Sequence, residues 1–189
     1  QRFARAMGHP PFDPVTPARH SDWVSKKQTL QVGVGTHPAS ATRIREFLRH
    51  HPEYAGGTIG AVALDRYGVL CAATSTGGVT LKMAGRVGDT PLPGCGNYAV
   101  PHAAASATGT GEYVIRSLAT REIADRVAQG RSLQSSVAGV LDLLGREFDA
   151  DVGFIALDAN GIVCGAHRTP HMPHAWFSGD SAIVAKMHA

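Results

Sequence analysis

The sequence has no apolar run that approaches the roughly 20 residues of a membrane-spanning helix. Its first residues, Gln1 to Arg5, are not followed by the apolar segment that a signal peptide requires. We therefore expect a soluble, cytoplasmic chain without a membrane partner. Because the chain begins with Gln rather than Met, we also expect that an upstream part has been removed or left out.

Cysteine and net charge are scarce as well. The three cysteines form no CxxC pair, which argues against a disulfide framework or a structural zinc site and favours a reducing compartment. The formal net charge is only +3 and the basic residues are scattered, so nothing indicates a nucleic-acid partner. With 189 residues, the chain is long enough for one domain with an ordinary core.

The first third of the chain contains few regular patterns. Residues 1–39 are rich in proline and polar groups and are predicted to be connective, with Ser21 as the cap of a short helix. Another short helix is predicted over residues 40–48. Residues 49–57, which include two histidines, a proline and two glycines, are predicted to form an exposed loop.

From residue 58 the patterns become those of a folded domain. Thr58–Asp65 and Val69–Thr74 predict a β-hairpin, and Phe154–Ala166 repeats its ALDxxG pattern and predicts a second one. Apolar stripes predict one helix from Gly111 to about residue 129 and another that Ser132 caps. The fold class is therefore α+β, with helices packed on an antiparallel sheet.

Thr58 is the candidate nucleophile, although a threonine hydroxyl needs a base and no histidine is suitably spaced. If the bond between Gly57 and Thr58 is hydrolysed, the freed α-amino group, with a reference pKa of about 8, can accept the hydroxyl proton. Gly56 and Gly57 would let the backbone bend into the shape that such a cleavage requires.

Four stretches together resemble the N-terminal-threonine hydrolases of the isoaspartyl peptidase/L-asparaginase family and the related glycosylasparaginases. The resemblance covers roughly residues 54–180 and implies the four-layer αββα sandwich of the Ntn hydrolases. The four stretches are Gly57–Asp65, Ala73–Gly78, Gly85–Leu92 and Ala107–Glu112.

The resemblance also implies roles for single residues. Thr58 would attack the side-chain amide carbonyl of an asparagine-like substrate to form an acyl-enzyme, and Thr76 would support its amine. The resemblance places Arg86 on the α-carboxylate of the substrate, where a guanidinium fork suits a planar anion. Asp89 would hold the α-ammonium group.

The remaining site residues follow Asp89 in the chain. The resemblance implies that the Thr108 hydroxyl and the Gly109 N–H form the oxyanion hole, and that Gly111 belongs to the substrate site. The helix that begins near Gly111 would add a favourable dipole. The loop Val100-Pro101-His102 is shorter than is usual in the family, which affects the expected placement of Thr108.

In this family the segment before the threonine becomes a separate α subunit. Residues 1–57 are therefore expected to be its C-terminal tail and linker, and residues 58–189 the catalytic β subunit. The family's sodium-binding loop would lie further upstream, so we assign no metal and expect no cofactor. The missing segment implies a homo-oligomer of cleaved αβ units or a partner that supplies it, because a lone β part would expose sheet edges.

The implied activity is hydrolysis of L-asparagine or of β-aspartyl (isoaspartyl) peptides. Gly57 favours this branch of the family, whereas Val152–Leu157 looks closer to the glycosylasparaginases. Glycosylasparaginase activity is therefore one alternative. A truncated, inactive homologue that serves as a binding or assembly module is another.

Other candidates are weaker. His167, His171 and His174 invite a metal site, but the prolines between them prevent a common helical face, so a solvated loop is the preferred interpretation. The glycines around Cys95 lack the remainder of a phosphate-loop pattern, and Cys95 itself is expected to be a packed thiol. Taken alone, Arg86 and Asp89 would form an ordinary surface ion pair.

Overall fold

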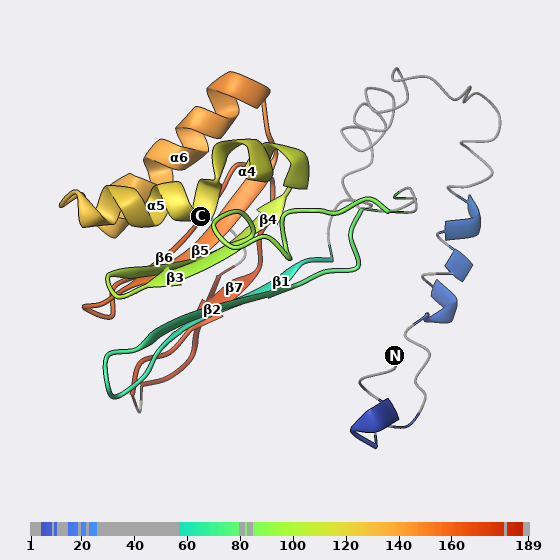
Figure 1. Cartoon of the computed structure of the whole chain (residues 1–189), viewed down its shortest axis with the longest axis horizontal. Coiled ribbons are helices and arrows are strands. Elements are labelled where there is room, and N and C mark those ends of the chain that lie inside the picture. Colours follow the sequence, from blue (N-terminus) through green and yellow to red (C-terminus); the bar gives the residue numbers. More distant parts are fainter. Residues whose placement is uncertain are drawn as a thin grey trace. The chain divides into compact units, whose positions relative to one another are not determined.

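Figure 1 shows the chain as a computed structural model, which describes residues 5–8, 10, 15–18, 20, 21, 23–25, 57–79, 82, 85–179 and 181–186. Two units are distinguished: residues 1–54 with 80–83, and residues 55–79 with 84–189. In the first unit Ser21 is itself helical, so its prediction as a helix cap is wrong. The predicted helix over residues 40–48 and the loop up to residue 56 lie outside the described residues.

The second unit begins with the first predicted hairpin. Strands β1 (Ile59–Leu64) and β2 (Leu70–Ser75) pair antiparallel, with Ile59 opposite Ser75. The Asp65 carboxylate closes the turn, because its Oδ1 accepts hydrogen bonds from the backbone N–H groups of Tyr67 and Val69, both at 2.8 Å. The prediction of this hairpin is confirmed.

The second predicted hairpin is confirmed too, and its turn repeats the first. Strands β5 (Val152–Asp158) and β6 (Val163–His167) are joined by a turn in which Asp158 Oδ1 accepts from the N–H groups of Asn160 and Ile162, both at 2.9 Å. The repeated ALDxxG pattern therefore encodes one turn geometry, used twice.

A four-stranded antiparallel sheet forms the centre of this unit, in the order β3 (Asn97–Val100), β4 (Ala103–Gly109), β5, β6. Helices α4 (Gly111–Ser117), α5 (Ala119–Ala128) and α6 (Leu133–Phe148) cover one face (Figure 1). A buried apolar core fills the space between these helices and the sheet.

Strands β1 and β2 pack on the opposite face of the four-stranded sheet. There Ala104 of β4 and Leu157 of β5 share a smaller core with Leu70 of β2, and Val62 of β1 packs against it. The order of layers is thus helices, sheet, sheet, which confirms the α+β class. A short hairpin of β7 (His174–Trp176) and β8 (Val184–Lys186) follows.

The helical region differs from the prediction in one respect. Ser132 caps α6 as expected, since its side chain accepts a hydrogen bond from the N–H of Ser135 at 3.2 Å. The single helix predicted over residues 111–129 is wrong, however, because Leu118 has left-handed backbone angles (φ 46°, ψ 46°) and separates α4 from α5. Its side chain is 45% exposed rather than part of the apolar stripe.

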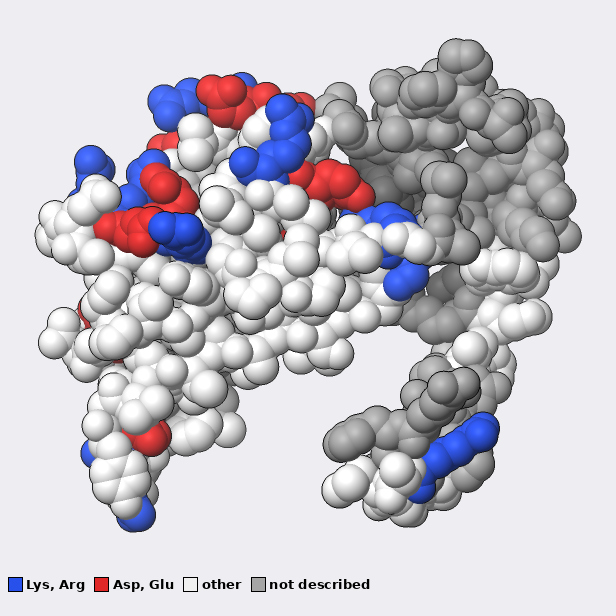
Figure 2. Space-filling view, in the orientation of Figure 1, with Lys and Arg blue, Asp and Glu red and all other residues white. Residues whose placement is uncertain are grey.

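Figure 2 shows acidic and basic side chains interspersed over the helical part of the second unit. In the described ranges no helix is long and apolar enough to cross a membrane.

The left-handed conformation of Leu118 generates a stability prediction. Leu118→Gly and Leu118→Ala remove the same packing contacts, but only glycine relieves the strain that a Cβ atom causes at positive φ. We expect the glycine variant to be more stable than the alanine variant by about 1 kcal/mol, the reverse of their order inside a helix. Chemical denaturation of both variants measures this difference, and a more stable alanine variant would contradict it.

Candidate functional site

Thr58 and Thr76 lie opposite each other at the open end of the first hairpin. Thr58 immediately precedes β1 and Thr76 immediately follows β2, so the pairing of Ile59 with Ser75 brings them together. Thr58 Oγ1 donates a hydrogen bond to Thr76 Oγ1 at 3.3 Å. Thr76 Oγ1 also accepts from the N–H of Gly78 at 3.0 Å, which fixes its orientation.

Gly57, on the other side of the bond predicted to be cleaved, has a φ of +145°. A Cβ atom built on it would meet nothing within 4 Å. The position therefore favours glycine because of its backbone conformation and not because of crowding.

A cluster of four residues, which we call the inter-sheet cluster, joins the hairpin to the four-stranded sheet. It consists of Gly60, Thr74, Gly96 and Ser106. Thr74 Oγ1 lies 2.7 Å from Ser106 Oγ and donates to the backbone oxygen of Gly96 at 3.1 Å. Gly60 lies directly against Ser106, whose hydroxyl would collide with a Cβ atom there. Without side-chain atoms at Gly60, the two sheets can approach closely enough for the hydrogen bond.

The inter-sheet cluster places the three predicted catalytic threonines at the same end of the sheets. Each of these threonines (Thr58, Thr76 and Thr108) lies two residues from a member of the cluster, on the same strand or on its extension. Because alternate residues of a strand share a face, each threonine lies on the same face as its cluster member. In the other direction along β1 and β4, Val62 packs against the smaller core to which Ala104 belongs. Strands β1 and β4 therefore run in opposite directions across the layers, which brings Thr108 toward the end where Thr58 lies.

Gly109 also occupies a position that only glycine fits. Its φ is +134°, and a Cβ atom would collide with the Asp151 carbonyl oxygen and lie 2.8 Å from Val152 Cα. Helix α4 begins two residues later, as predicted, but it has only seven residues. Its dipole at Thr108 and Gly109 is therefore smaller than the predicted long helix would supply.

Arg86, Asp89 and Gly111 form a second group. A Cβ atom on Gly111 would lie 2.7 Å from Asp89 Oδ1 and 3.2 Å from Arg86 Nη2, so the three residues touch. Asp89 is 7% exposed, and its Oδ2 has no hydrogen-bond partner. Burial raises the pKa of this carboxyl above its ordinary value of 3.8, against the opposing effects of backbone N–H groups and the Arg86 charge.

The interpretation of Arg86 and Asp89 as a surface ion pair is not what the structure shows. Arg86 instead donates from Nε and Nη2 to a single oxygen of Glu112, at 2.9 and 2.8 Å. Glu112 was not among the residues predicted to form the site. Its position at the end of Ala107–Glu112, a stretch that contains three predicted site residues, could have indicated a role in the site.

Gly96 connects the two groups of residues and was also missed. Its N–H donates to the Asp89 carbonyl oxygen at 3.1 Å, while its own oxygen accepts from Thr74. A Cβ atom on Gly96 would lie 2.6 Å from that Asp89 oxygen, so no other residue fits without a shift of the backbone. Gly96 thus holds the loop that carries Asp89 close to the sheet.

The histidines do not form a solvated loop throughout. His167 ends β6 and His174 begins β7; both are half-buried, and their Nδ1 atoms lie 2.7 and 2.8 Å from the backbone oxygens of Thr169 and Met172. Among the described residues, no three His, Cys, Asp or Glu side chains could together hold a metal ion. Cys95 is buried and burial raises the pKa of its thiol, as suits a packed residue.

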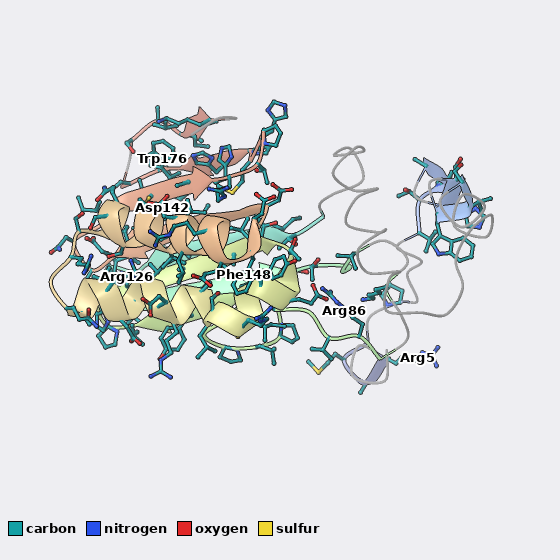
Figure 3. All side chains as sticks on the ribbon, turned by 90° about the horizontal axis from the view of Figure 1, so that it is seen from above. Arg5, Arg86, Arg126, Asp142, Phe148 and Trp176 are labelled. Atoms are coloured by element: carbon teal, nitrogen blue, oxygen red, sulfur yellow. The ribbon has the colours of Figure 1, made fainter. Side chains whose placement is uncertain are left out.

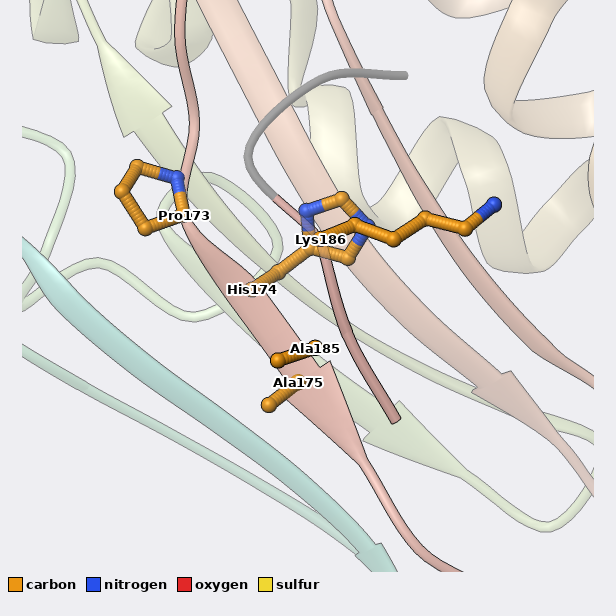
Figure 4. A pocket seen from close by; sticks show the side chains of 5 residues that line it. All are labelled: Pro173, His174, Ala175, Ala185 and Lys186. Carbon is orange, nitrogen blue, oxygen red and sulfur yellow. The ribbon is translucent and has the colours of Figure 1, made fainter. Parts of the chain in front are cut away.

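An open hollow between β7 and β8 contains none of the predicted site residues. Figure 4 shows it from close by, with the rings of Pro173 and His174 and the side chain of Lys186 around it. It has no polar group beyond His174 and Lys186 among its lining side chains. We therefore do not treat it as the functional site.

Comparison with known proteins gives one family. The Asparaginase_2 family, described as asparaginase, matches residues 1–185. A plant-type L-asparaginase of Pyrococcus abyssi is 41% identical over 176 residues, which cover 93% of this chain and 56% of the relative. An isoaspartyl peptidase/L-asparaginase of Nostoc sp. is 38% identical over 190 residues, covering 98% of this chain and 53% of the relative. The chain thus spans about half the length of the curated relatives it matches.

The buried carboxyl of Asp89 generates a prediction about pH. Its pKa is higher in the folded than in the unfolded chain, so the folded chain binds the proton more tightly and loses stability as the pH rises from 3.8 through the folded pKa. Asp89→Asn removes this loss. In thermal unfolding experiments, the stability of the Asp89→Asn variant relative to the unmodified chain should therefore increase as the pH rises from 3 to 7.

The exposed Asp142 provides the control, because Asp142→Asn also removes one carboxylate but from the surface of α6. A stability difference between Asp89→Asn and the unmodified chain that is the same at pH 3 and pH 7 would contradict the prediction.

Proposed function

Because this chain belongs to the Asparaginase_2 family, we propose that it is an amidohydrolase that frees aspartate from L-asparagine or from β-aspartyl peptides. The observation that carries the proposal is the hydrogen-bonded pair of Thr58 and Thr76. Thr58 directly follows Gly57, which has a positive φ. The names of the relatives, L-asparaginase and isoaspartyl peptidase, supply the substrate class.

The proposed reaction begins with hydrolysis of the bond between Gly57 and Thr58. The α-amine of Thr58 then takes the hydroxyl proton while Oγ1 attacks the side-chain amide carbonyl of the substrate. The C–N bond of the amide breaks, and the leaving amine departs with that proton. Water then attacks the resulting ester, which releases aspartate and restores the threonine hydroxyl. Thr76, hydrogen-bonded to Thr58 at 3.3 Å, orients the nucleophile.

Other residues would recognise the substrate and stabilise the developing charge. We assign the Thr108 hydroxyl and the Gly109 N–H to the oxyanion, where one lost donor typically lowers the rate by about 10²–10³. Arg86 is assigned to the α-carboxylate and Asp89 to the α-ammonium group. The partnerless Oδ2 of the buried Asp89 supports the last assignment, because a cation bound there would satisfy it.

The architecture of the whole protein is part of the proposal. Apart from Ser75, the outward face of the hairpin consists of exposed small and apolar residues: Ile59, Ala61, Ala63, Cys71 and Ala73. We propose that a further helical layer covers this face and completes the αββα sandwich, with residues 1–57 as the end of the α part and residues 58–189 as the β part. The layer would come from an upstream segment, from a partner or from another copy in a homo-oligomer.

The nucleophile is tested by Thr58→Ala. The unmodified chain should yield two fragments on a denaturing gel, residues 1–57 and 58–189, and should hydrolyse L-asparagine or a β-aspartyl dipeptide. Thr58→Ala should remain one chain and lose activity by about 10⁴-fold or more, since both steps require the hydroxyl. Ser75→Ala, next to Thr76 but exposed on the outward face, is the control and should behave like the unmodified chain.

An uncut chain that still hydrolyses these substrates would refute the mechanism. Glycosylated asparagine, offered beside the other two substrates, distinguishes glycosylasparaginase activity.

The covering layer is tested by a charge on the outward face. Ala73→Glu places a carboxylate at the centre of the apolar face and should reduce the mass of the assembly measured by light scattering, because a buried unpaired charge is costly. Arg66→Glu changes the charge at the exposed turn of the same hairpin and should leave the mass unchanged. Equal masses for both variants would indicate that neither a partner nor another copy covers the outward face.

A further inference from the structure

The guanidinium group of Arg86 has two edges that can each bind a carboxylate, and one of them is occupied. Glu112 Oε1 accepts from Nε at 2.9 Å and from Nη2 at 2.8 Å. These two nitrogens form the side edge of the group. The end edge, formed by Nη1 and the second N–H of Nη2, is not used by Glu112 and has the fork geometry that matches a carboxylate.

Two glycines flank this end edge. A Cβ atom on Gly88 would lie 2.7 Å from Nη1, and one on Gly111 would lie 3.2 Å from Nη2. Any larger residue at Gly88 would push against the guanidinium, and one at Gly111 would push against both Arg86 and Asp89. Neither glycine therefore places a side chain over the end edge, which lies beside the buried carboxylate of Asp89.

Glu112 is well placed to hold Arg86 in this orientation. It lies in the first turn of α4, where the helix dipole favours a carboxylate, and α4 packs on the core through Tyr113 and Val114. Arg86 lies in a loop outside the helices and strands, so its long side chain would lose rotamer freedom when a ligand binds. A fixed partner on a helix removes part of that loss before the ligand arrives.

We propose that Glu112 is a positioning residue for substrate recognition: it holds the side edge of Arg86 so that the end edge receives the α-carboxylate of the substrate. This inference rests on the proposed function, because it takes the ligand to be an α-amino acid. Glu112 acts through Arg86 and takes no part in the bond-breaking steps.

A positioning role for Glu112 differs measurably from a role in stabilising the fold. Its side chain is 55% exposed and that of Arg86 is 17% exposed, and an ion pair of this kind contributes little to stability. Glu112→Ala should therefore unfold at nearly the same temperature as the unmodified chain but bind substrate more weakly. Glu112→Gln keeps an oxygen that accepts from the side edge and should restore most of the affinity.

The experiment compares Glu112→Ala, Glu112→Gln and Glu122→Ala with the unmodified chain. Glu122 is the matched control: it pairs with Arg126 at the same 2.8 Å, and Figure 3 shows Arg126 at the end of the helical layer away from Arg86. Calorimetric titration with L-aspartate, which carries both α-groups, measures affinity without catalysis. Steady-state kinetics with L-asparagine measure KM and kcat separately.

We expect Glu112→Ala to weaken L-aspartate binding and raise KM by about tenfold, with kcat changed less than about threefold. Glu112→Gln should stay within about threefold of the unmodified chain in both quantities, and Glu122→Ala should be unchanged. The inference is overturned if Glu112→Ala binds L-aspartate as tightly as the unmodified chain, or if Glu112→Gln is as weak as Glu112→Ala.

Failure of the proposed function is recognised separately. In one outcome, the unmodified chain and the three variants bind L-aspartate with the expected order of affinities while Thr58→Ala hydrolyses as fast as the unmodified chain. In that case the assigned nucleophile is wrong and the positioning role of Glu112 stands. If the unmodified chain does not bind L-aspartate at all, the positioning role is refuted.

Discussion

The hydrogen bond between Thr74 and Ser106 fixes how the two sheets lie on each other. Ser106 is almost fully buried, and a buried hydroxyl without a partner would be costly, so the hairpin has one favoured position on β4. Gly60 makes the approach possible because it has no side chain to separate the sheets. The position of Thr58 follows from this contact, since it lies two residues from Gly60 on the extension of β1.

The same contact extends to the loop that carries Asp89. The carbonyl oxygen of Gly96 accepts from Thr74 and from the N–H of Ala107, while the N–H of Gly96 donates to the loop. The loop is therefore tied to both sheets through a residue that cannot carry a side chain. A shift of the hairpin would displace the proposed nucleophile and the proposed substrate-binding group together, which couples the geometry of bond cleavage to that of recognition.

The parts of the fold that sequence predicts are those that local physics determines. Asp65 and Asp158 close their turns with hydrogen bonds to residues two and four positions on, and Ser132 caps α6 with one to a residue three positions on, so each element can be identified within a short window. The break at Leu118 could not be predicted in this way, because leucine has no preference for positive φ and tertiary packing imposes it.

The site, too, has features that local patterns predict and contacts that they do not. Periodicity and composition place Thr58 before a strand and Gly111 at the start of a helix, but nothing local says that Gly96 must approach Asp89 or that Arg86 pairs with Glu112. Those contacts join residues 7 to 26 positions apart, through loops whose course no sequence pattern specifies. The grouping of Arg86, Asp89 and Gly111 was expected only through resemblance to a family, which contains the three-dimensional information that a single sequence lacks.

The charges of this group indicate what kind of ligand completes it. Glu112 pairs with only one edge of the Arg86 guanidinium, whereas the carboxyl of Asp89 is buried and its Oδ2 lacks a partner. The burial cost, seen in the raised pKa of Asp89, would be offset by a cation bound at Oδ2. The end edge of Arg86, which we propose as the site of the α-carboxylate, lies only a few ångströms from Asp89. A ligand with an ammonium and a carboxylate on one carbon satisfies both groups at once, whereas a simple anion or a simple cation satisfies only one.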